Sequence, residues 1–124
     1  MSRPYRERLV SARLPAPRWL LARVVGHSME PTLLDGDLLL VDRRRAIRPA
    51  TVAVVLLPDR TTAVKRVTSL QRDGWWVERD NPRHGVDSWS VGAIPDRDVV
   101  GLVVARLWPR PVLVATLPAP GAAP

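Results

Sequence analysis

The chain has 124 residues, enough for one domain with a hydrophobic core and too few to expect two. Apolar residues make up 46% of it and charged residues 25%, which is typical of a soluble globular protein rather than a disordered one. The absence of cysteine excludes disulfides, thiolate metal sites and a cysteine nucleophile. The net charge of +7 comes almost entirely from arginine and favours acidic partners such as anionic lipid or nucleic acid.

The first segment, residues 1–18, is basic and interrupted by Pro15 and Pro17, so we expect a weakly ordered arm. It lacks the apolar stretch of a signal peptide. The longest apolar run, residues 52–57, has the length of a strand and is far below the ~20 residues of a membrane-spanning helix. We therefore expect a cytoplasmic, soluble protein. Residues 19–21 are apolar and lie beside arginines, so a weak peripheral contact with a membrane is one interpretation of them. A first core strand explains these residues better.

Short apolar or alternating segments separated by proline and glycine turns follow this arm. Their spacing predicts a mostly β protein with a single domain rather than βαβ units. We expect this domain to span residues 19–108, with residues 109–124 as a Pro/Ala-rich tail outside it. The expected strands cover residues 19–25, 38–41, 51–57, 61–70, 75–78 and 99–107.

The segment VVGHSMEPTLLDGD places Ser28 between a β-branched run and a proline turn. A serine hydroxyl is a weak nucleophile unless a neighbouring base takes its proton. His27 is badly placed for this because adjacent side chains of an extended chain point to opposite faces, and His84 belongs to a polar loop. Two single histidines without paired spacing do not indicate a metal site, so we expect no metal and no other cofactor.

Lys65, the only lysine of the chain, is the other candidate base. Strand alternation places Ala63, Lys65 and Val67 on one face. Burial among apolar groups would lower the pKa of the lysine and make its neutral amine available as a general base. The same periodicity fits a solvent-facing lysine on an edge strand equally well.

Three segments occur in the order GHSMEPTLLDGDLLLV, AVKRV and RDNPRHGVDSWSVGAIP. Together they resemble the conserved boxes of type I signal peptidases, the S26 family of Ser/Lys serine proteases. The resemblance implies a signal-peptidase/LexA-like β-fold of coiled antiparallel sheets and the activity of a serine endopeptidase. Ser28 would attack the scissile carbonyl and Lys65 would be its general base. The N–H of Ser28 would donate a hydrogen bond to the oxyanion, and one such donor stabilises the transition state by ~3 kcal/mol.

The resemblance also implies supporting and substrate-binding residues. Arg66 and Asp87 would form an ion pair. Asp80, Asn81 and Ser88 match other positions that support the site. The substrate-binding positions would be Gly26, His27, Met29 and Pro31.

The sequence departs from the family pattern at several positions. The family has a serine that orients the lysine where this chain has Gly85, which leaves Lys65 to be positioned by Ser88, water or packing. Pro82 and Trp89 replace common arginines, and Gly26 provides no side-chain oxyanion donor.

The substrate implied by the resemblance is a precursor protein or peptide, bound in extended form along strand edges, with small residues next to the cut. Small, arginine-rich members of this family resemble the maturation protease of nickel-containing superoxide dismutase. The expected function is therefore removal of an N-terminal extension from a precursor, and no specific nucleic acid is expected as a partner.

Two other functions remain open from the sequence. A LexA-like self-cleaving regulator would share the fold and the Ser/Lys pair, although no Ala-Gly or Cys-Gly cleavage dipeptide precedes Ser28. A non-enzymatic, basic β-domain could instead bind nucleic acid by stacking bases on Trp75, Trp76 and Trp89.

Overall fold

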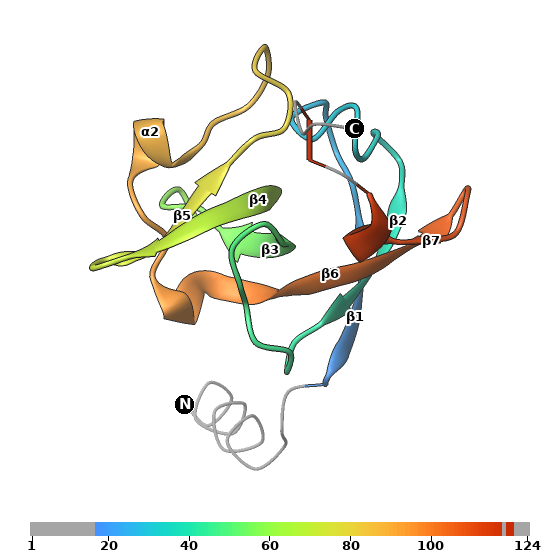
Figure 1. Cartoon of the computed structure of the whole chain (residues 1–124), viewed down its shortest axis with the longest axis horizontal. Coiled ribbons are helices and arrows are strands. Elements are labelled where there is room, and N and C mark those ends of the chain that lie inside the picture. The colour runs from blue at the N-terminus through green and yellow to red at the C-terminus, as the bar shows by residue number, and fades with distance from the viewer. Residues whose placement is uncertain (1–16, 118, 121–124) are drawn as a thin grey trace, which may run out of the picture.

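The computed structural model describes residues 17–117, 119 and 120. It is mostly β and contains all six expected strands, which confirms the predicted fold class (Figure 1). Among the described residues, no helix is long and apolar enough to cross a lipid bilayer. The strands are β1 (Trp19–Arg23), β2 (Leu38–Asp42), β3 (Val52–Leu56), β4 (Thr62–Gln71), β5 (Gly74–Glu78), β6 (Val99–Trp108) and β7 (Val112–Leu113), with short helices α2 (Ser88–Val91), η1 (Asp96–Asp98) and η2 (Val114–Thr116).

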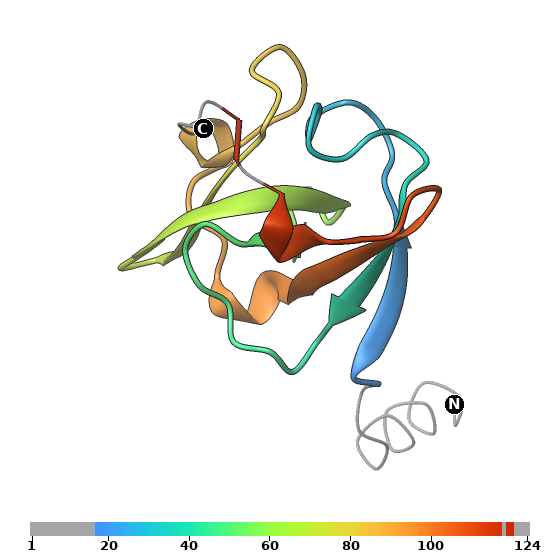
Figure 2. The same ribbon diagram turned by 45° about the vertical axis from the view of Figure 1, so that its right-hand side comes forward.

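The strands form one antiparallel sheet in the order β1-β2-β6-β3-β4-β5, and β7 pairs with β6. Strand β6 pairs with both β2 and β3, so that Leu102 faces Asp42 on one side and Ala53 on the other. Register shifts in these pairings and between β4 and β5 bend the strands. The sheet therefore curls around the core instead of lying flat (Figures 1 and 2).

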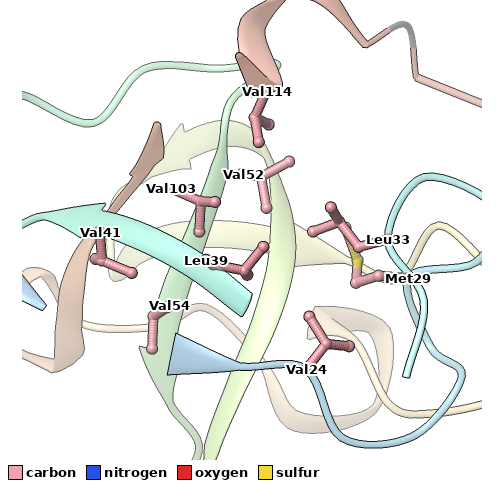
Figure 3. Packing of buried hydrophobic residues seen from close by; sticks show 9 residues of the cluster. All are labelled: Val24, Met29, Leu33, Leu39, Val41, Val52, Val54, Val103 and Val114. Atoms are coloured by element: carbon pink, nitrogen blue, oxygen red, sulfur yellow. The ribbon is translucent and has the colours of Figure 1, made fainter. Parts of the chain in front are cut away.

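Strand β3 is apolar throughout because it contributes to two cores. Its alternating residues Val52 and Val54 join a first cluster, and Ala53 and Val55 join a second. This explains why residues 52–57 are a continuous apolar run rather than an alternating one. The first cluster, shown in Figure 3, contains Val24, Met29, Leu33, Leu39, Val41, Val52, Val54, Val103 and Val114. The second contains Ala53, Val55, Leu57, Val67, Trp75, Val77 and Ile94.

The expected boundary at residue 109 is wrong. Strand β7 pairs with the end of β6, and Val114 is buried in the first cluster. The apolar side chains in this stretch are the physical reason, because they cover core residues that β6 alone would leave exposed. Of the predicted N-terminal arm, residues 1–16 lie outside the described residues, and Arg18 donates two hydrogen bonds of 3.1 Å to the buried carboxylate of Asp42.

Gly74, at the turn between β4 and β5, lies directly against the backbone of Ile94. Its φ is +138°, and a Cβ at this position would lie 2.2 Å from the carbonyl oxygen of Ile94. Gly36 also has a positive φ, +90°, but a Cβ there would meet open space.

We expect Gly36→Ala to lower the free energy of unfolding by about 1 kcal/mol, the cost of the left-handed backbone alone. Gly74→Ala should cost about 1–3 kcal/mol more because it adds a backbone clash. Urea denaturation of both variants measures the difference. Equal losses would contradict the close approach of Gly74 to Ile94.

Candidate active site

Ser28 lies in the turn that connects β1 to β2, and the residues that follow it fix this turn to the core. Met29 and Leu33 are fully buried in the first cluster (Figure 3). The N–H of Leu33 donates to the carbonyl of Met29 at 2.9 Å, and the N–H of Gly26 donates to the Asp35 carboxylate at 2.7 Å. Ser28 itself stays partly exposed. The sequence thus places a partly exposed serine on a turn that buried side chains and hydrogen bonds hold in place.

Asn81 connects the DN segment to this serine turn. Its side-chain amide donates to the carbonyl of His27 at 2.9 Å, and its backbone N–H donates to the carbonyl of Ser28 at 2.8 Å. Two bonds to consecutive carbonyls fix the backbone direction at the serine. The role expected for Asn81 in supporting the site therefore has a geometric basis.

The ion pair predicted between Arg66 and Asp87 is wrong, because Arg66 pairs with Asp80 instead. The guanidinium donates from Nε to Oδ1 at 3.0 Å and from Nη2 to Oδ2 at 2.8 Å. Strand register explains the choice of partner: Arg66 lies opposite Glu78, and Asp80 follows two residues later. Asp80 also accepts a 2.6 Å bond from the hydroxyl of Thr32, which is a contact the sequence did not indicate.

Asp87 and Ser88 instead form the start of α2. Asp87 caps this helix by accepting the N–H of Trp89 at 3.1 Å, and its negative charge acts on Lys65. Ser88 is buried, and its hydroxyl oxygen accepts the N–H of Val77 at 2.8 Å. Ser88 therefore ties α2 to β5.

Lys65 is 2% exposed, so it is a buried lysine and not the solvent-facing edge residue that periodicity also allowed. Its neighbours Arg66 and Val67 are buried as well, because β4 is covered on both faces at this point. Burial is the main cause that lowers the pKa of Lys65 below its ordinary value of 10.5. The charge of Asp87 opposes this pKa shift, and the charge of Arg79 adds to it.

Gly85 brings the serine and the lysine together. A Cβ at this position would lie 3.2 Å from Nζ of Lys65 and 3.4 Å from Oγ of Ser28, so both polar atoms lie close to the same point. The same Cβ would lie only 2.5 Å from Cβ of Ser28. With a φ of +91°, residue 85 therefore fits as glycine and leaves no room for the serine of the family pattern.

A cavity of about 160 Å³ opens beside Ser28 between two strands that are not neighbours in the sheet. The curl of the sheet brings the end of β1 close to the beginning of β4 there. Among the described residues, no strand pairs with the outer edge of β1, and β5 pairs with β4 only from Arg66 onward. Unpaired strand edges of this kind, seen here among residues 17–117, are where an extended peptide can add to a sheet. The lining residues are Ala22, Arg23, Val24, Val25, Ser28, Met29, Val54, Thr62, Ala63 and Val64.

The remaining predicted substrate-binding residues lie around the serine turn. Met29 lines the cavity, whereas Gly26, His27 and Pro31 are absent from its lining. The His27 ring pairs with the Glu30 carboxylate at 2.5 Å, and this hydrogen bond raises the pKa of His27. The His27 and His84 rings lie 5.6 Å apart.

The tryptophans do not form a common surface for stacking bases. Trp75 is buried in the second cluster and donates to the Asp96 carboxylate at 3.0 Å. Trp76 and Trp89 contact each other edge to face at 5.3 Å. This arrangement leaves little support for the nucleic-acid-binding function considered from the sequence.

Comparison with known proteins shows the family of this chain. The sequence model of the family described as Peptidase S24-like matches residues 4–104, so the chain belongs to this family. It is also 27% identical to mitochondrial inner membrane protease subunit 1 of Xenopus tropicalis. This match covers 68% of the chain and 66% of the relative, slightly less than two thirds of that protein. The chain is thus a member of the Peptidase S24-like family and has the S24/S26 type of β-fold.

The buried amine of Lys65 predicts a specific dependence of stability on pH. Between its lowered folded-state pKa and the ordinary value of 10.5, the unfolded chain binds more protons than the folded chain. Stability therefore rises with pH through this window. We expect Lys65→Met to have a higher Tm than wild type near neutral pH, and the difference to shrink as the pH approaches 10.5. Thermal unfolding followed by circular dichroism tests this, and equal Tm values near neutral pH would mean that the folded-state amine is well solvated.

Proposed function

We propose that this protein is a serine endopeptidase in which Ser28 is the nucleophile and Lys65 is its general base. The observation that supports this most directly is the approach of both Ser28 Oγ and Lys65 Nζ to one point at Gly85. The burial that lowers the pKa of Lys65 favours the neutral amine that a general base requires. The family match supports peptidase activity in general.

The reaction follows from these positions. Ser28 Oγ attacks the scissile carbonyl carbon while its proton passes to Nζ of Lys65, and the N–H of Ser28 donates to the developing oxyanion. The tetrahedral intermediate collapses, the C–N bond breaks, and the Lys65 ammonium returns its proton to the leaving amine. Water, deprotonated by Lys65, then hydrolyses the acyl-enzyme and restores Ser28.

The cavity favours a small residue immediately before the cut. Its volume is about 160 Å³, and Ala22, Val54 and Ala63 are among its lining residues. A peptide lying between the edges of β1 and β4 would place alternate side chains into it. We therefore propose extended precursor segments with small residues as substrates.

The particular substrate we propose is an N-terminal extension of a precursor protein. Nickel-containing superoxide dismutase precursor is the first candidate, on the strength of the resemblance of this chain to small, arginine-rich members of the signal peptidase family. Self-cleavage, as in LexA-like regulators, is the second candidate because the Ser/Lys pair would serve an intramolecular cut equally well. Incubation at alkaline pH followed by intact-mass measurement separates the two, since only a self-cleaving chain shortens itself.

The proposal is tested with fluorogenic peptides that carry alanine or phenylalanine before the scissile bond, alongside the nickel superoxide dismutase precursor peptide. Wild type should cut the alanine peptide in preference to the phenylalanine peptide. Ser28→Ala and Lys65→Ala should each lower kcat/KM by about 10³-fold or more. Ser90→Ala, an exposed serine in α2, is the matched control. Cleavage that survives both substitutions would rule out the dyad.

Gly85→Ala should lower kcat by on the order of 10²-fold, because the new methyl group displaces Ser28 or the loop from its productive position. Gly92→Ala is the matched control, since Gly92 also has a positive φ, +83°, but faces open space. Initial rates measured at saturating substrate distinguish the two. A Gly85→Ala enzyme as fast as Gly92→Ala would contradict the packing of Gly85 on the dyad.

A further inference from the structure

Arg79 lies between the end of β5 and the DN segment, and its guanidinium holds the loop of residues 82–85. Nη1 donates to the carbonyl of Gly85 at 2.6 Å, and Nη2 donates to the carbonyl of Pro82 at 2.9 Å. Nε is buried without a hydrogen-bond partner among the described residues. A buried, unpaired donor is unfavourable, so the two carbonyl bonds, and not the pairing of every donor, hold Arg79 in this position.

The loop that Arg79 holds is the one that presses Gly85 against Ser28 and Lys65. Its residues 82–85 are exposed, so little burial fixes its position. Asn81 provides the other bonds, accepting the N–H of Arg83 at 3.0 Å on its side chain and that of His84 at 3.4 Å on its backbone. The Arg79 bonds close this loop at its far end, next to the dyad.

Two charged side chains act on the Lys65 amine from the surrounding elements. Asp87, at the start of α2, favours the ammonium form, and Arg79, which follows β5, disfavours it. The positive charge of Arg79 therefore partly cancels the effect of Asp87.

We propose that Arg79 is a positioning residue of the peptidase site, which fastens the 82–85 loop against Ser28 and Lys65 and places a permanent positive charge near the lysine amine. This inference rests on the proposed function. It goes beyond that proposal because neither the Ser/Lys pair nor the signal-peptidase resemblance assigns a role to residue 79. The charge and the two carbonyl bonds make separate contributions that different substitutions can separate.

Lys65 is the only lysine in the chain, so protein grown with [¹³C]lysine gives a single side-chain Cε signal whose pH titration reports the Lys65 pKa directly. The titration is measured for wild type, Arg79→Gln and Arg79→Lys. Arg79→Lys gives a second Cε signal from the introduced lysine, and the same substitution combined with Lys65→Met identifies which of its two signals belongs to Lys65. Arg72→Gln, in the exposed β4–β5 turn, removes the same charge at a distance and is the matched control. Peptidase rates and Tm are measured on the same four proteins.

Arg79→Gln should raise the Lys65 titration midpoint, because a like charge that disfavours the ammonium is removed. In the pH profile of this variant, the rise of kcat/KM on the acidic side should shift to higher pH by the same amount. Arg79→Lys keeps the positive charge but loses the pair of guanidinium hydrogen bonds to Gly85 and Pro82. The Lys65 titration midpoint of this variant should therefore match wild type, while its kcat should fall about tenfold or more. Arg72→Gln should match wild type in both measurements.

An unchanged Lys65 titration midpoint in Arg79→Gln would overturn the proposal that the charge of Arg79 acts on Lys65. Wild-type kcat in Arg79→Lys would overturn the proposal that the Arg79 hydrogen bonds position the 82–85 loop. If Arg79→Gln does not fold, the Arg79→Lys rate still decides the positioning part. A wild-type protein without peptidase activity would overturn the proposed function, while the titration would still report whether Arg79 acts on Lys65. The two failures are therefore distinguishable.

Discussion

The ion pair between Arg66 and Asp80 connects all parts of the candidate site. Arg66 belongs to the same strand as Lys65, while Asp80 begins the segment that carries Asn81 and leads to Gly85. Asp80 also accepts the Thr32 hydroxyl, which anchors the serine turn to the same carboxylate. Arg66 further donates to the carbonyl of Ala50 at 3.1 Å. Because this pair is almost fully buried, loss of one partner would leave an unpaired charge in the core.

The site combines groups that a stable core would avoid. Lys65 is buried where a neutral side chain would fit better, and Arg79 leaves a buried nitrogen without a partner among the described residues. Both features are unfavourable for folding. The two hydrophobic clusters around β3 supply the compensating stability, and they also bring the ends of β1 and β4 together across the cavity. Local instability of this kind is typical of functional sites.

Several features of the site were predictable from local pattern and resemblance. The placement of Ser28 on a turn and of Lys65 on an apolar strand follows from sequence periodicity, and the DN segment was expected to support them. The partner of Arg66 was mispredicted, because it depends on the register of β4 against β5, which brings Asp80 rather than Asp87 opposite the guanidinium. The contact of Thr32 and the bonds of Arg79 carried no sequence signal, since both depend on loop paths.

The sequence by itself determined the strands, the turns between them and the mostly β class, because alternation of apolar residues and proline or glycine punctuation act over a few residues. It also singled out Ser28 and Lys65, the two residues on which the proposed peptidase chemistry rests. Only the tertiary structure decided that Lys65 is buried, that Gly85 must lack a side chain and that Val112–Leu113 belongs to the sheet. These properties depend on which distant segments meet when the sheet curls, and local pattern carries no information about that.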